Sequence, residues 1–215
     1  MDSRLDIIEQ LRRKGLVHNA QQYAENLDLV PTGIYNLDRL CPGGLARGRI
    51  SEIVTGGWGV CSVVFSVLAQ ATGQDASVAL VDPSNGLDAV SASAHGVSLS
   101  MLLWVVPRGA KEAFRAAELI LTTERFHTLV VDLTNVSSRS SIAAWMRMDR
   151  LARRSNTVVC VLSSSGVVGP FAHTLLGLRA CSPVWRRGGD AENTTSPYWL
   201  ADVEFDFEIR RRRSA

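Results

Sequence analysis

The segment PTGIYNLDRLCPGGLARGRISEIVTGGWGVCS, from Pro31 to Ser62, decides the fold of this 215-residue chain. It predicts a short helix over residues 34–40, a glycine-rich connection and a buried strand over residues 50–54. A second glycine turn then opens an apolar helix over about residues 60–70. Strand, glycine turn and helix in this order form the layout of a phosphate-binding loop, in which backbone N–H groups hold an anion at a helix N-terminus.

The residues that such a loop needs are missing from this layout. A phosphate-binding loop requires G-x-x-x-x-G-K-[ST]. Counting back from Ser62 puts Cys61 at the lysine position, Val60 at the second glycine and Thr55 at the first. We therefore expect no nucleotide, no other cofactor and no metal at the degenerate loop, which consists of Gly56, Gly57, Gly59, Cys61 and Ser62.

Size and composition indicate a soluble protein with one main domain. An apolar content of 46% and a charged content of 20% are ordinary for a globular chain, and the net charge of +2 is too small to argue for a nucleic-acid or membrane partner. The four cysteines form no C-x-x-C pair, which disfavours zinc and a disulfide framework. The N-terminus does not resemble a signal peptide and no apolar run is long enough to span a bilayer, so we expect a cytoplasmic protein.

Strands and helices alternate downstream of residue 50. Nearly all-apolar runs predict strands covered on both faces, at residues 50–54, 77–81, 102–106, 128–131 and 157–162. Helices are predicted between them at about residues 60–70, 86–95, 111–123 and 140–153. Past residue 162 we expect a strand over 176–180, a polar loop over 185–197 and an alternating strand over 203–209. The prediction is an α/β fold with a mostly parallel sheet and added C-terminal antiparallel strands.

The first 30 residues form a separate section in this interpretation. Leu5, Ile8 and Leu11 share one face of a predicted helix, and a weaker helix is predicted over about residues 19–26. We expect an N-terminal helical arm over residues 1–30 that either docks on another subunit or folds back on its own domain, followed by a core over residues 31–215.

A series of short motifs keeps one order and spacing along the core. They are Thr32-Gly33, Leu37-Asp38, Gly43-Gly44-Leu45, Gly48-Arg49-Ile50, Glu52-Ile53, Val81-Asp82, Leu87-Asp88, Gly96-Val97, Leu102-Leu103, Pro107 and Leu129-Val130-Val131-Asp132. Through these motifs the core resembles the bacterial RecA recombinases over about residues 30–165. The resemblance implies a three-layer α/β/α RecA-like core with a Walker B-like strand that ends at Asp132.

The residues that serve ATP hydrolysis in RecA have no counterparts in this chain. Cys61 replaces the lysine, Trp58 adds bulk to the turn, and Ser84 occupies the position of the catalytic glutamate. Ser62 and Asp132 remain at the two positions associated with Mg²⁺, where we expect only a helix-start hydroxyl and a strand-end carboxylate. Loss of both the base and the cation implies a protein that is not an enzyme.

The lost nucleotide site and a DNA-binding loop shortened to about residues 163–169 make the chain similar to the ImuA group of RecA-like proteins. That resemblance implies a non-catalytic adaptor of error-prone translesion DNA synthesis in the SOS response to DNA damage. It would dock an ImuB-like relative of the Y-family polymerases, beside an error-prone replicative-type polymerase and RecA, and be nucleoid-associated when engaged. Two alternatives stay open: a SulA-type cell-division inhibitor, and an atypical ATP-dependent RecA paralogue that binds single-stranded DNA. A homo-oligomer is also left open.

Two groups of arginines are candidates for contact with DNA or a partner. In the functional interpretation, these side chains form a surface that contacts the phosphates of DNA, and we expect any DNA binding to be weak. The alternatives are a solvated helix exterior for the first group and a frayed basic tail for the second. The groups are Arg147, Arg150, Arg153 and Arg154, and Arg210, Arg211, Arg212 and Arg213.

Overall fold

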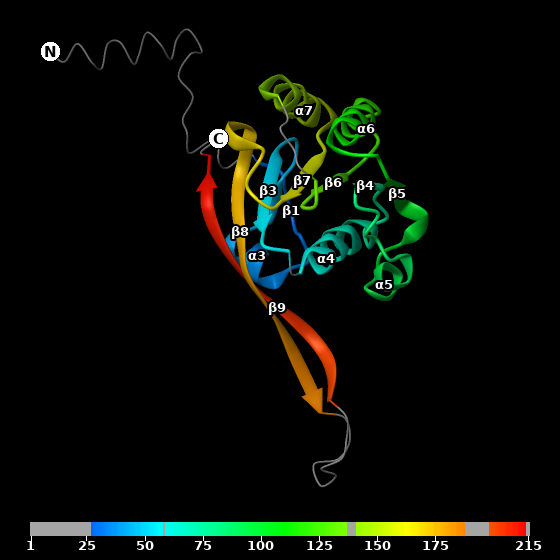
Figure 1. Ribbon diagram of the computed structural model, residues 1–215, viewed down its shortest axis with the longest axis vertical. Helices are drawn as coiled ribbons and strands as arrows, with labels where there is room; N and C mark the ends of the chain where they lie inside the picture. The colour runs from blue at the N-terminus through cyan, green and yellow to red at the C-terminus, as the bar shows by residue number, and fades with distance from the viewer. Residues whose placement is uncertain (1–26, 58, 137–140, 188–197, 214–215) are drawn as a thin grey trace, which may run out of the picture. The chain divides into compact units, whose positions relative to one another are not determined.

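The structure is a computed structural model that describes residues 27–57, 59–136, 141–187 and 198–213 (Figure 1). Contacts divide the chain into two units, one of residues 1–28 with 213–215 and one of residues 29–212. Most of the predicted N-terminal arm lies outside the described residues. Within the larger unit, β1 (Leu29–Val30) pairs antiparallel with β2 (Leu45–Ala46). Among the described residues, no helix combines the length and the apolar character that crossing a membrane requires.

The large sheet has seven strands in the order β5-β4-β6-β7-β3-β8-β9. All neighbours are parallel except β8 and β9, which confirms the predicted α/β fold with C-terminal antiparallel strands. Strands β3, β4 and β7 are buried from end to end and β6 everywhere except at Asp132, as expected of apolar, β-branched runs covered on both faces. The prediction that residues 102–106 are covered in the same way is wrong, because β5 is the edge strand and exposes Leu103 and Trp104. The strands are β3 (Ile50–Thr55), β4 (Val78–Val81), β5 (Leu102–Val105), β6 (Thr128–Leu133), β7 (Val158–Ser163), β8 (Ala172–Arg187) and β9 (Tyr198–Arg212).

Helices cover both faces of the sheet (Figure 1). One buried cluster joins α3 and α4 to the sheet, and a second joins α6 and α7 to the other side. Ser141 caps α7 by accepting a hydrogen bond from the Ala144 N–H, and Asn156 ends that helix in the left-handed conformation. The helices are α3 (Tyr35–Leu40), α4 (Val60–Thr72), α5 (Ala89–Ala94), α6 (Ala110–Thr122) and α7 (Ile142–Ser155), with 3₁₀ turns at Leu99–Met101 and Gly169–Phe171.

The C-terminal hairpin is longer than predicted. The strand expected over residues 176–180 is the middle of the 16-residue β8, and β9 begins five residues before the predicted start at 203. The loop predicted over 185–197 is wrong at its start, because residues 185–187 still pair with β9; residues 188–197 lie outside the described part. Beyond Leu178, β8 no longer pairs with β3. The strands there pair only with each other, and residues 182–185 are largely exposed, so no buried face marks that end of the hairpin in the sequence.

A buried carboxyl group on β3 holds the connection between β7 and β8. Both strands run parallel to β3, on its two sides, so residues 164–171 must cross back over the sheet. Glu52 is fully buried and accepts hydrogen bonds from Ser163 Oγ (2.8 Å), the Val167 N–H (2.6 Å) and the Val168 N–H (3.2 Å). This crossover is the segment predicted as a shortened loop at about residues 163–169.

Glu52→Ala should strongly destabilise the protein, because it leaves three donors without their acceptor. At about 1–3 kcal/mol for each buried unsatisfied group, the free energy of unfolding should fall by at least about 3 kcal/mol. Urea unfolding measures the change as a lower midpoint at unchanged slope.

Ser51→Ala is the matched control for this prediction. Ser51 is also fully buried on β3, but its hydroxyl has no hydrogen-bond partner among the described residues. Its removal should change stability by less than about 0.5 kcal/mol. Equal losses for the two variants would show that Glu52 does not hold the crossover.

Candidate functional site

The glycine turn lies between the end of β3 at Thr55 and the start of α4 at Val60. Gly57 and Gly59 have φ values of 112° and 80°, a left-handed region that favours glycine. A Cβ atom added to Gly59 would lie 2.9 Å from Cys181 Sγ and 3.1 Å from Phe205 Cε1. The β8–β9 hairpin therefore packs directly against the turn, and glycine is required at position 59. Gly56 is exposed, with nothing near its Cα that a side chain would meet.

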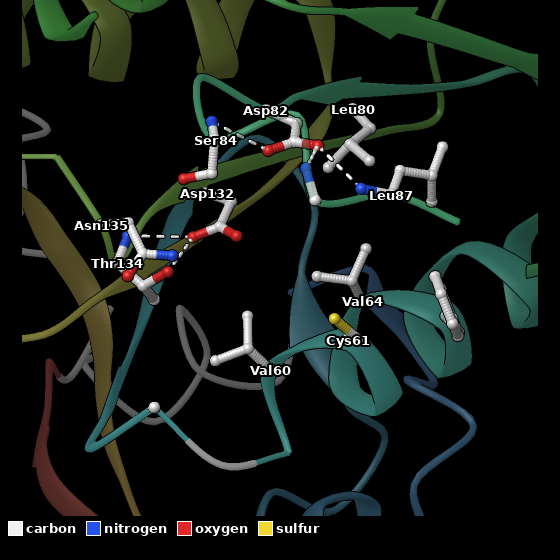
Figure 2. Close-up of a pocket in the computed structure, with 13 residues that line it drawn as sticks. Val60, Cys61, Val64, Leu80, Asp82, Ser84, Leu87, Asp132, Thr134 and Asn135 are labelled. Atoms are coloured by element: carbon white, nitrogen blue, oxygen red, sulfur yellow. Dashed lines mark hydrogen bonds between the residues drawn. The ribbon is translucent and has the colours of Figure 1, made fainter. Parts of the chain in front are cut away.

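A small cavity opens beside this turn, at the carboxyl ends of β4 and β6 (Figure 2). Its volume is about 150 Å³, which is below the roughly 300–1,000 Å³ of ordinary ligand pockets. The structure brings together Cys61, Ser84 and Asp132, which the sequence singled out. Apolar side chains complete most of the wall, namely Val60, Val64, Phe65, Leu80 and Leu87.

Ser62 is not part of that cavity. It lines a separate groove of about 810 Å³, together with residues of α3, α4, α5 and β9 that include Tyr35, His95 and Glu204. The two positions associated with Mg²⁺ in the RecA resemblance, Ser62 and Asp132, thus line different spaces. Neither lining contains a lysine or an arginine among the described residues.

Two aspartates in the cavity have backbone groups as their partners. Asp82 Oδ1 accepts from the Ser84 N–H (3.1 Å), and its Oδ2 accepts from the N–H groups of Gly86 (2.7 Å) and Leu87 (3.1 Å). Asp132 Oδ1 accepts from the N–H and the hydroxyl of Thr134, at 2.9 and 2.6 Å (Figure 2). Both carboxyl groups therefore fix the turns that follow their strands. Reasoning from the sequence assigned Asp82 no role in the site, although its position directly after a buried strand was a signal for one.

The thiol of Cys61 faces this acidic environment without a compensating cation. Burial raises the pKa of Cys61, and the charges of Asp132 and Asp82 raise it further. The thiol is therefore protonated and neutral at neutral pH. A phosphate placed here would meet two carboxyl groups and no positive side chain among the described residues of the lining.

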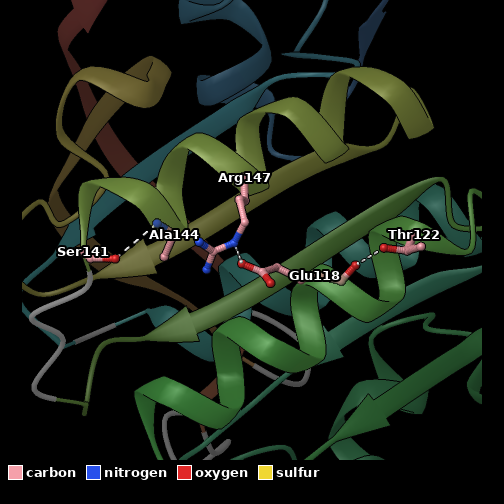
Figure 3. Close-up of polar contacts among 5 residues, drawn as sticks. All are labelled: Glu118, Thr122, Ser141, Ala144 and Arg147. Atoms are coloured by element: carbon pink, nitrogen blue, oxygen red, sulfur yellow. Dashed lines mark hydrogen bonds and ion pairs between the residues drawn. The ribbon is translucent and has the colours of Figure 1, made fainter.

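Most of the predicted contact arginines on α7 are ion-paired. Arg147 Nε lies 2.9 Å from Glu118 Oε1 on α6 (Figure 3), Arg153 Nε lies 3.0 Å from Asp149, and Arg154 Nε lies 2.7 Å from Glu124. Arg150 is exposed, with no carboxylate partner among the described residues.

The arginines at the end of β9 have different surroundings. Arg210 Nε lies 3.0 Å from Glu208 Oε1, and Arg211 donates a hydrogen bond to the Gly169 carbonyl. Arg213 belongs to the smaller unit of the chain. The structure therefore does not gather the eight candidate arginines into one surface.

Asp132→Asn should make the Cys61 thiol react faster. Removing the negative charge lowers the thiol pKa, so more thiolate is present at pH 8, while the amide oxygen can still accept from Thr134. We expect several-fold faster modification by a disulfide reagent, followed by mass spectrometry of the Cys61 peptide. Cys160 is the internal control, because complete burial raises its pKa to about 12 and it should not react in either protein. Unchanged Cys61 rates would mean that Asp132 does not act on the thiol.

Known proteins with similar sequences and folds agree on one family. The profile of the RecA N-terminal domain matches residues 1–159. Protein RecA of Fusobacterium nucleatum is 34% identical over 50% of this chain and 29% of its own length. RecA of Deinococcus radiodurans is 27% identical over 77% of this chain and 49% of its own. The chain thus matches less than half of the length of these curated relatives.

The crystal structure of the RadB recombinase superposes with a TM-score of 0.60 at 19% identity, covering 82% of this chain and 99% of that one. The chain belongs to the RecA N-terminal domain family.

Proposed function

We propose that this protein is a non-catalytic, RecA-like adaptor of an error-prone translesion synthesis complex in the bacterial DNA-damage response. Its partner would be an ImuB-like relative of the Y-family polymerases, as the resemblance to the ImuA group implies. The observation that supports the absence of catalysis is the neutral Cys61 thiol, which lines the same cavity as Asp82 and Asp132, where a motor of this family needs a cation.

A phosphate at this site would be opposed in three ways. The lysine is absent, two carboxyl groups contribute negative charge, and Ser84 provides no base where the RecA resemblance expects one. Loss of a charge-assisted hydrogen bond alone weakens phosphate binding by about 1.5–3 kcal/mol. The α/β body is retained around the site, which suits a role as a rigid docking partner.

A second candidate is an atypical RecA paralogue that still binds nucleotide. The groove beside Ser62 favours it, because about 810 Å³ is enough for a ligand of nucleotide size. Against it stands the absence of lysine and arginine from the described lining of that groove. The two candidates differ in whether function depends on the hydroxyl of Ser62.

Ser62→Ala separates these functions in a strain that lacks the chromosomal gene. The frequency of DNA-damage-induced mutation should be restored equally by the wild-type chain and by Ser62→Ala, since an adaptor needs no Mg²⁺-binding hydroxyl. A loss as large as that of the deletion strain would favour the nucleotide-dependent paralogue. Gln70→Ala, two turns further along α4 and outside the lining of the groove, controls for changes to the helix surface.

Co-expression with the ImuB-like polymerase relative of the same organism tests the partnership. We expect a complex that survives gel filtration and is unaffected by adding or omitting ATP. Absence of a complex, together with stable binding to a tubulin-like division protein, would contradict the proposal and favour the SulA-type alternative.

A further inference from the structure

Arginines from distant parts of the sequence meet at the amino-end edge of the parallel strands. This edge lies opposite the carboxyl ends that form the small cavity. Arg125 precedes β6, and Arg47 and Arg49 precede β3. Arg153 and Arg154 end α7 just before β7. Because β9 is antiparallel, its last residues, Arg211 and Arg212, reach the same edge, at the top of the sheet in Figure 1.

Backbone contacts fix these segments beside one another. The Gly48 N–H donates to the Thr157 carbonyl (3.1 Å), and the Val158 N–H donates to the His127 carbonyl (3.0 Å). These two bonds tie the starts of β3, β7 and β6 together. Ile50 is in register with Ala172, and Thr174 is in register with Arg212. The start of β8 and the end of β9 therefore lie beside the start of β3.

The arginines are thus arranged along a line. The strands β6, β7, β3, β8 and β9 are consecutive neighbours. At about 4.8 Å per strand, their ends span roughly 19 Å. That distance is long enough for several consecutive phosphates of one nucleic-acid strand. Asp75 precedes β4, the next strand outward, and marks the end of the basic row.

Several of these charges are available to a ligand. Arg125, Arg211 and Arg212 are exposed and have no carboxylate partner among the described residues. Burial raises the pKa of the Cys41 thiol, and the positive charge of Arg212 partly opposes that increase. The charge of Arg212 is therefore felt by a neighbouring group. Arg153 and Arg154 are paired with Asp149 and Glu124, but these pairs are largely exposed. Exposed pairs contribute only about 0–1 kcal/mol, so a phosphate can replace the carboxylate.

Two further arginines contribute positive charge from within the row. Arg47 Nη1 donates to the Asn156 carbonyl at 3.4 Å, and Arg49 Nη1 donates to the Gly48 carbonyl at 3.2 Å. Both side chains are half-buried, so their positions are set by the fold.

We propose that this edge binds the sugar-phosphate backbone of a nucleic acid. The row of guanidinium groups matches a chain of regularly spaced phosphates better than it matches a single anion, and guanidinium is the side chain suited to bidentate phosphate contact. The contact reads no sequence and depends on salt. It lies at the strand ends and the last turn of α7, and it requires no polymerase partner. Its failure would therefore leave the proposed adaptor function untouched.

Fluorescence anisotropy with the full chain and a fluorescein-labelled 20-mer of dT tests the proposal. The wild-type chain should bind at about 50 mM NaCl and weaken steeply by about 200 mM. The variant Arg125→Ala/Arg211→Ala/Arg212→Ala should bind at least tenfold more weakly at the lower salt. Its slope of log K against log salt should be smaller by about 2, at roughly 0.7 for each lost contact with a single strand.

A second triple variant provides the matched control. Arg108→Ala/Lys111→Ala/Arg115→Ala removes the same charge from exposed positions outside the row, and should bind within about twofold of the wild type. If loss of the Arg211 bond to Gly169 impairs folding, Arg125→Ala/Arg212→Ala replaces the first variant, with an expected slope change of about 1.4.

Three results would overturn the proposal. The first is no binding by the folded wild-type chain at about 50 mM NaCl. The second is an equal loss of binding in the control variant. The third is displacement of the labelled oligonucleotide by polyglutamate as effectively as by unlabelled DNA, when the two competitors are compared at equal concentrations of negative charge. That result would assign the edge to an acidic protein.

Discussion

The fold depends on the burial of β3 between two parallel neighbours. All six of its residues are buried, and it pairs with β7 on one side and β8 on the other. This arrangement forces the chain to cross the sheet between Ser163 and Ala172, and the Glu52 carboxyl group holds that crossover through three donors. Because the glycine turn and α4 follow directly from β3, the buried position of β3 determines where both of them lie.

The site therefore keeps the strand, glycine turn and helix of a RecA-like nucleotide loop, but it lacks the lysine that would bind phosphate. Asp82 and Asp132 hold the turns after β4 and β6, so both have a structural reason to be there without a metal or a nucleotide. Burial and the charges of Asp132 and Asp82 raise the pKa of Cys61, so its thiol stays protonated. A lysine at position 61 would place one positive charge beside both carboxyl groups, and without it no lysine or arginine of the described lining offsets their negative charge. The proposed change from motor to adaptor needs no change in fold.

The sequence predicted the core well because each core element has a strong local signal. Strands β3, β4, β6 and β7 are apolar runs covered on both faces, and α4, α6 and α7 were placed within two residues at each end. The far end of the β8–β9 hairpin was missed because its strands pair only with each other and residues 182–185 are largely exposed. The RecA resemblance singled out Cys61, Ser84 and Asp132 one by one, and they line one cavity because strand ends converge in a parallel sheet. The separation of Ser62 from Asp132, the role of Glu52 and the pairing of Arg147 with Glu118 depend on contacts between distant residues, which no local pattern encodes.

The most direct test of the account is isothermal titration of the purified full chain with Mg²⁺-ATP. With no lysine at position 61 and two carboxyl groups facing the site, the account predicts no saturable heat up to about 1 mM nucleotide, which corresponds to less than about 4 kcal/mol of binding free energy. A one-to-one isotherm with a dissociation constant in the micromolar range, about 8 kcal/mol, would contradict it. The protein would then be a nucleotide-dependent member of the family.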